Sequence, residues 1–86
     1  MTYKIDYDID VDKVFAKMPK RDVKAIKERI DDLAENPRPY GSTKLINRPG
    51  YRIRAGNYRI IYEILEDRLV VLVLNVDLRK DIYKYT

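Results

Sequence analysis

Three arginines around a two-residue turn are the residues of this sequence best suited to chemistry. Arg52 and Arg54 alternate with apolar residues, and Arg59 follows the dipeptide Gly56-Asn57. That dipeptide favours a two-residue hairpin loop, which places Arg54 directly opposite Arg59 and leaves Arg52 two residues along the same face. Like charges facing each other across a ladder destabilise it. The pattern indicates an anion site, because guanidinium groups match phosphate well; spacing alone equally allows a solvated face whose arginines splay apart.

Arginine and tyrosine together suit one reaction, the cleavage of RNA by its own 2′-hydroxyl. That reaction needs a group that takes the hydroxyl proton, positive charge on the phosphorane, and a donor for the leaving 5′-oxygen. Arginines supply charge but are poor bases, since guanidinium stays protonated at physiological pH. A helical turn over 79–83 would place Arg79 and Tyr83 on one side.

Tyr83 has more than one open role. It becomes a base only if neighbouring cations lower its pKa from the usual value of about 10. A plug in the core and a platform on which a base stacks are equally open.

The absence of two residue types excludes several kinds of functional site. The 86 residues of the chain include no cysteine and no histidine, which excludes disulfides, thiol nucleophiles, imidazole chemistry and zinc sites of the usual kind. No charged segment followed by an apolar core opens the chain, and its longest apolar run, 69–74, is far too short to span a bilayer. We therefore expect a cytoplasmic protein that does not contact membrane.

The alternating aspartates from Asp6 to Asp12 resemble the start of a calcium-binding loop. Such a loop needs glycine at its sixth position and glutamate at its twelfth. Counted from Asp6, these positions hold Val11 and Lys17, so we expect no metal site. The cluster instead serves solubility and caps a helix, with Asp8 or Asp10 at the helix start.

The charge is distributed unevenly along the chain. The net charge is +4. Residues 1–43 hold nine basic and nine acidic side chains, whereas 44–86 hold nine basic and five acidic ones, and six of those nine bases are arginine. An acidic or phosphate-bearing partner is therefore expected on the second half.

The first half predicts a strand followed by two helices. Residues 3–7 alternate as a half-buried strand does. Apolar residues at helical spacing over 11–18 predict one helix, and those over 23–34 predict a second. Pro19 separates the two, and Asn36-Pro37 ends the second. The result is a helical hairpin with one apolar side.

The second half predicts an antiparallel meander. A turn-rich connector over 36–42 leads to strands predicted at 44–47, 51–55, 57–65 and 69–76. The last strand is apolar on both faces, so we expect an inner strand that is covered on both sides. The fold class is α+β: one domain over 1–86 with an N-terminal strand, a helical hairpin, an antiparallel β-meander and a short C-terminal segment.

The chain resembles the RelE-type toxins of the RelE/ParE superfamily, from type II toxin–antitoxin systems. The order of elements matches over nearly the whole chain. The segments that carry the resemblance are Tyr51-Arg52-Ile53-Arg54, Gly56 to Glu63, Val70 to Val76 and Arg79-Lys80-Asp81-Ile82-Tyr83.

The resemblance implies an endoribonuclease that cuts mRNA in the ribosomal A site and so inhibits translation, without metal or other cofactor. Arg52 and Arg54 stand where relatives often have lysine, one of them proposed as the base. Arg59 and Arg79 match phosphate-stabilising arginines, with Arg79 also assisting the leaving group, and Tyr83 matches a tyrosine that orients the nucleophile or stacks on a base. RNA contacts are expected from Lys44, Arg48, Lys80 and Lys84.

Two departures from the family pattern bear on catalysis. Arginine at 52 and 54 removes the usual lysine. Asp77-Leu78 stands where many relatives have glycine followed by lysine or histidine.

The implied partners are the ribosome with its mRNA and a cognate antitoxin, which would be acidic and amphipathic. Operator DNA would be bound only through the complex with that antitoxin. Two alternatives remain open. One is a ParE-like poison of DNA gyrase without RNase activity, and the other is a degenerate domain that only binds nucleic acid.

Overall fold

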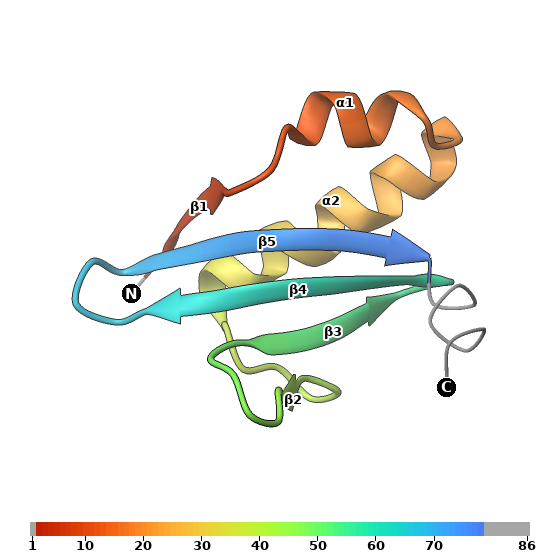
Figure 1. The fold of residues 1–86 in the computed structure, drawn as a ribbon. Helices are drawn as coiled ribbons and strands as arrows, with labels where there is room; N and C mark the ends of the chain where they lie inside the picture. The colour runs from red at the N-terminus through yellow and green to blue at the C-terminus, as the bar shows by residue number, and fades with distance from the viewer. Residues whose placement is uncertain (1, 79–86) are drawn as a thin grey trace.

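Helices cover one face of a single β-sheet in this protein (Figure 1). The structure is a computed structural model and describes residues 2–78. Its elements are β1 (Lys4–Tyr7), α1 (Val11–Ala16), α2 (Lys20–Glu35), β2 (Thr43–Lys44), β3 (Tyr51–Ala55), β4 (Tyr58–Leu65) and β5 (Val70–Leu78). The predicted α+β class and order of elements are confirmed. The helical turn predicted at 79–83 lies outside the described residues.

The strands form one sheet in the order β1-β5-β4-β3-β2. β2, β3, β4 and β5 pair antiparallel, as the predicted meander requires, with a two-residue loop between β3 and β4. β1 instead pairs with β5 in parallel, Lys4 opposite Val70. The last described strand is therefore an inner strand, as predicted.

Capping residues and prolines in the sequence set the limits of the two helices. Asp10 caps α1, its side chain accepting a hydrogen bond from the Lys13 backbone N–H at 3.2 Å. α1 ends at Ala16, two residues before the predicted end. Beyond it, the backbone N–H groups of Lys17 and Met18 bond to carbonyls three residues earlier, and the chain then turns at Pro19 into α2. No helix within residues 2–78 is long and apolar enough to cross a membrane.

The core lies between α2 and the sheet face turned toward it. Ile26, Ile30 and Leu33 of α2 are fully buried. They belong to one cluster with alternating residues of the three central strands, namely Ile53, Ala55, Tyr58, Ile60, Tyr62, Val71, Val73 and Val76. On the opposite face, Leu72 and Leu74 are only half-buried. The helical hairpin covers one face of this strand, as expected. On the other face the neighbouring Ile61 of β4 is 2% exposed, and the covering of the last strand on that face stays a prediction.

Backbone conformation explains where the predicted strand limits were wrong. β2 stops after two residues, since the Leu45 backbone N–H bonds to the Gly50 carbonyl and Asn47 takes a positive φ of 64°. β5 begins only at Val70, because Leu69 has a φ of 53° in the preceding turn.

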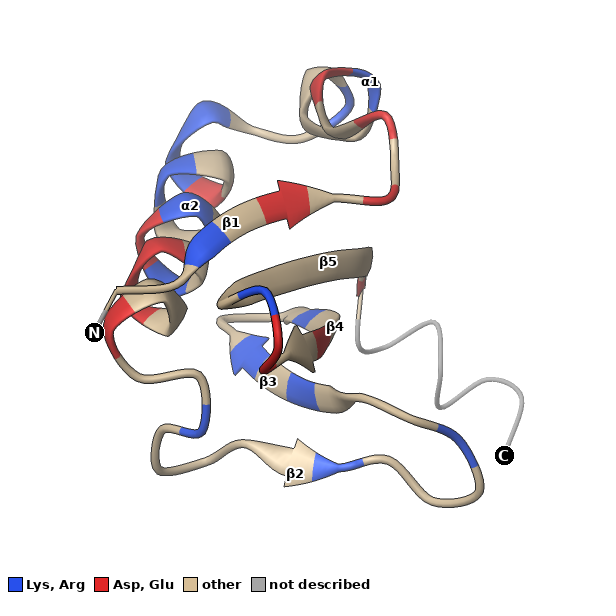
Figure 2. Ribbon diagram, turned by 90° about the vertical axis from the view of Figure 1, so that its left-hand side faces the viewer, with Lys and Arg blue, Asp and Glu red and all other residues tan. Residues whose placement is uncertain are grey.

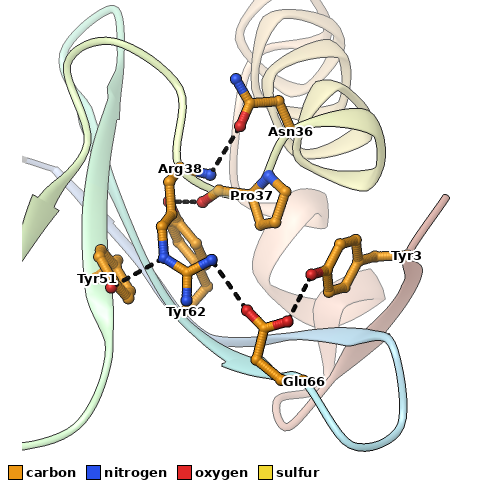
Figure 3. A network of polar contacts seen from close by, with 7 residues as sticks. All are labelled: Tyr3, Asn36, Pro37, Arg38, Tyr51, Tyr62 and Glu66. Atoms are coloured by element: carbon orange, nitrogen blue, oxygen red, sulfur yellow. Dashed lines mark hydrogen bonds and ion pairs between the residues drawn. The ribbon is translucent and has the colours of Figure 1, made fainter. Parts of the chain in front are cut away.

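A polar network ties the chain after α2 to the end of the sheet (Figure 3). Arg38 forms an ion pair of 2.9 Å with Glu66 and donates from Nε to the Tyr51 hydroxyl at 3.1 Å. Tyr3 donates to the other Glu66 oxygen at 2.7 Å. The buried Tyr62 hydroxyl donates to the Pro37 carbonyl at 2.7 Å.

Glu66→Gln tests the charged part of this network. The bond from Tyr3 and the Arg38 charge lower the pKa of Glu66 in the folded state. Its contribution to folding is therefore present above the unfolded pKa of about 4.5 and is lost as the pH falls through the lower folded pKa. Urea unfolding should show the variant less stable at neutral pH, and the difference should shrink as the pH is lowered below 4.5. Asp67→Asn, in the same turn, is the control and should show no deficit at neutral pH, because Asp67 is exposed. An equal deficit for the Glu66→Gln variant at neutral and at acidic pH would contradict the expectation.

Tyr62→Phe tests the buried hydroxyl. The change leaves the Pro37 carbonyl without its donor, so we expect a loss of about 1–2 kcal/mol in the free energy of unfolding at neutral pH. Burial raises the pKa of Tyr62 to about 12, so the wild type should lose this advantage between pH 10 and 12, as the unfolded chain ionises first. The matched control is Tyr40→Phe, since Tyr40 is 101% exposed. Equal stability of both variants would rule out a role for the buried bond.

Candidate functional site

The hairpin of β3 and β4 brings three arginines onto the sheet face opposite the helices. Arg54 pairs directly with Arg59, and Ala55 pairs with Tyr58 around the Gly56-Asn57 loop, which confirms the predicted register. Arg52 shares the strand and the face of Arg54, and both are exposed. Figure 2 shows the basic segments of β3 and β4 on neighbouring strands, while α2 lies on one side of the sheet.

An aspartate extends this row across the third strand. Asp77 of β5 pairs with Arg59 on the side away from Arg54. A bulge in β5 makes this possible: Tyr62 pairs with Val73, whereas Ile61 pairs with Asn75, so Leu74 is an extra residue. Without that extra residue, Asp77 would share the helix-facing side with Val73. Arg54, Arg59 and Asp77 therefore form one row across three strands.

Hydrogen bonding holds the Asp77 carboxylate in place. The Asn75 side-chain amide donates to Oδ2 of Asp77, and the Asn75 amide oxygen accepts from the Val76 backbone N–H at 2.9 Å. No ion pair within 4.0 Å joins Asp77 to Arg59 among residues 2–78. The carboxylate is thus oriented by its own strand rather than by the arginines.

Arg59 is the most constrained of the three arginines. Its side chain is half-buried, and its Nε is buried with no hydrogen-bond partner within the described part of the chain. A buried donor without an acceptor costs about 1–3 kcal/mol. Such a donor is expected where an anion is to be bound.

α2 fixes the hairpin from the opposite face. Arg29 donates from Nε to the Arg54 carbonyl at 3.2 Å. The Tyr58 hydroxyl donates to Asp22 at 2.9 Å, and burial together with that bond raises the pKa of Tyr58. Tyr58 precedes Arg59 in the chain, so the helix anchors the backbone next to both facing arginines. These supports come from residues 25 or more positions away, so no local pattern in the sequence indicates them.

Lys44 and Arg48, the other two predicted site residues within residues 2–78, do not join the row. Lys44 pairs with Tyr51, so it lies on the face opposite the arginines, and it is Thr43 that pairs with Arg52. Arg48 is exposed in the loop before β3. The other four predicted residues lie outside the described residues: Arg79, Lys80, Tyr83 and Lys84. Within residues 2–78, no three acidic side chains gather closely enough to hold a metal ion.

A groove of about 390 Å³ lies between α1 and the ends of β4 and β5. Val14 and Met18, whose helical spacing predicts a place on the apolar side of the hairpin, line it and are only half-buried. Tyr58 and Leu78 form part of its floor, and Lys13 and Lys17 lie at it as well. The groove is mainly on the helix side of the sheet, but Asp77 also lines it, so it reaches the Asp77 end of the arginine row.

Curated relatives match this chain over most of their length. Toxin RelG of Mycobacterium tuberculosis is 30% identical over 98% of this chain and 99% of its own. The mRNA interferase toxin RelE of Escherichia coli is 26% identical over 93% of this chain and 86% of its own. The putative toxin RelE1 of Methanocaldococcus jannaschii is 27% identical over 98% of both chains.

Solved structures extend the likeness to the fold. The toxin–antitoxin complex RelBE2 of M. tuberculosis contains a chain that superposes with a TM-score of 0.78 at 26% identity, covering 92% of this chain and 100% of that one. The RelE–RelB complex of Pyrococcus horikoshii gives 0.76 at 27% identity, covering 92% and 97%. Residues 3–83 match the family model described as the ParE toxin of the type II toxin–antitoxin system parDE. This chain therefore belongs to that toxin family, and it is a RelE-type member of the RelE/ParE superfamily.

Proposed function

We propose that this protein is a ribosome-dependent endoribonuclease that cleaves mRNA in the A site and so arrests translation. The observation that carries the proposal is the facing pair of Arg54 and Arg59 on the sheet face opposite the helices. Two like charges in register are unfavourable by themselves. A bound phosphate removes that repulsion, so the arrangement suits a phosphate-containing ligand.

The reaction needs no metal in this proposal. The 2′-hydroxyl of one nucleotide attacks the adjacent phosphate, and Arg54 and Arg59 stabilise the negative charge that grows on the phosphorane. Arg52 contacts the message backbone along β3. By resemblance, Arg79 assists the leaving oxygen and Tyr83 orients the nucleophile or stacks on a base.

The relatives support both the activity and a partner. The E. coli relative is named an mRNA interferase, and the P. horikoshii relative was solved as a complex of RelE with RelB. We infer that this chain likewise has a cognate antitoxin. That antitoxin would be acidic, to match the net charge of +4, and operator DNA would be bound only through the complex.

Arg59→Ala separates activity from stability. We expect cleavage of message on programmed ribosomes with an empty A site to fall by about 10²–10³-fold, because one charge on the phosphorane is lost. The melting temperature should not fall, since the change removes a buried donor that has no partner within residues 2–78 and also the repulsion from Arg54. Primer extension measures the cuts and calorimetry the melting. Arg68→Ala is the control, because Arg68 is exposed in the turn before β5.

Two outcomes would contradict the proposal. Cuts that persist unchanged in the Arg59→Ala variant would remove the facing arginines from the mechanism. No cuts from a folded wild type that still arrests growth would reject the nuclease. The matched family description names ParE, so that second outcome leads to a gyrase cleavage assay and the gyrase-poison alternative.

A further inference from the structure

We propose that Asp77 is the general base that takes the proton from the attacking 2′-hydroxyl. The inference rests on the proposed nuclease function and adds to it the group that the arginines do not provide. A guanidinium stays protonated at physiological pH, so none of the three arginines on this face accepts a proton. The chain also has no histidine. A carboxylate is the remaining ordinary base for the described part of this face.

The register places that carboxylate beside the phosphate-binding charges. Asp77 is the cross-strand neighbour of Arg59, which is in turn the neighbour of Arg54. Adjacent strands lie about 4.7–4.9 Å apart, so a phosphate held over Arg54 and Arg59 has Asp77 on its flank. The other acid of this face within residues 2–78, Glu63, pairs with Leu72, well along β4 from Arg59.

The carboxylate is both exposed and oriented. Asp77 is exposed, and the Asn75 amide engages its Oδ2 but not its Oδ1. The bulge at Leu74 puts Asn75 and Asp77 on the arginine face together. Bulges commonly redirect side chains next to active sites. One carboxylate oxygen thus remains to accept a proton, while the other fixes the direction of the group.

The step balances without a co-reactant beyond solvent. The 2′-oxygen bonds to phosphorus as its proton passes to Asp77, and Arg54 and Arg59 hold the phosphorane. The bond between phosphorus and the 5′-oxygen then breaks, and that oxygen takes a proton from water. The products are a 2′,3′-cyclic phosphate and a 5′-hydroxyl, and Asp77 returns its proton to solvent.

Asp77→Asn tests the inference on ribosome-bound message under single-turnover conditions. Asparagine keeps an oxygen for the Asn75 bond but does not take up the proton, so the rate should fall by about 10²–10⁴-fold. The wild-type rate should depend on pH less steeply than the rate of the variant, because its proton acceptor is part of the protein. In the variant, attack depends on hydroxide, so the remaining rate should rise about tenfold per pH unit.

Two controls make the result specific. Glu63→Gln removes the other carboxylate of the same face and should leave rate and pH profile unchanged. Melting temperatures of both variants show that they fold.

The outcomes separate this inference from the nuclease itself. If the wild type cuts and the Asp77→Asn variant cuts equally fast, or more slowly but with an unchanged pH profile, Asp77 only offsets the charge of Arg59 and the inference is wrong. If the folded wild type makes no cuts, the nuclease fails and the inference fails with it.

Discussion

Burial of one sheet face against α2 is the interaction on which the rest of the structure depends. Within residues 2–78 the buried apolar side chains other than Ile61 form one core cluster, and α2 supplies three fully buried side chains to it. Because side chains alternate along a strand, burying Ile53 and Ile60 forces Arg54 and Arg59 to the opposite face. A slip of one residue would put the arginines into the core. The hydrophobic core thus sets the position of the charges, although it does not touch them.

Local patterns in the sequence were sufficient to predict half of the fold and the facing arginines at the centre of the site. Gly56-Asn57 fixes the hairpin because Gly56 takes a φ of 60°, which few other residues adopt without strain. The facing of Arg54 and Arg59 follows from that loop by counting. Helix limits were predictable to within three residues, since Asp10 and Pro19 act on neighbouring backbone.

Long-range geometry was not predictable in the same way. The parallel pairing of β1 with β5 and the bond between Tyr3 and Glu66 join residues more than 60 positions apart. The bulge at Leu74 left no signal in an apolar run, yet it decides which face Asp77 occupies. Comparison with the family pattern identified Asp77 as unusual. Only the pairing register of β4 and β5 shows that Asp77 lies beside Arg59. The same bulge explains why simple alternation along β5 fails beyond Val73.

The closure of the sheet by β1 has a consequence for the order of events during synthesis. Lys4 of β1 pairs with Val70 of β5, 66 residues later in the chain. At about 5–20 residues per second, a ribosome needs roughly 3–13 s to make that stretch. Throughout this time the first strand lacks its partner strand β5. Arg59, once it has been made, still lacks its neighbour Asp77. A newly made chain therefore completes its sheet only after β5 has left the exit tunnel, and until then the ribosome that makes it carries an unfinished toxin.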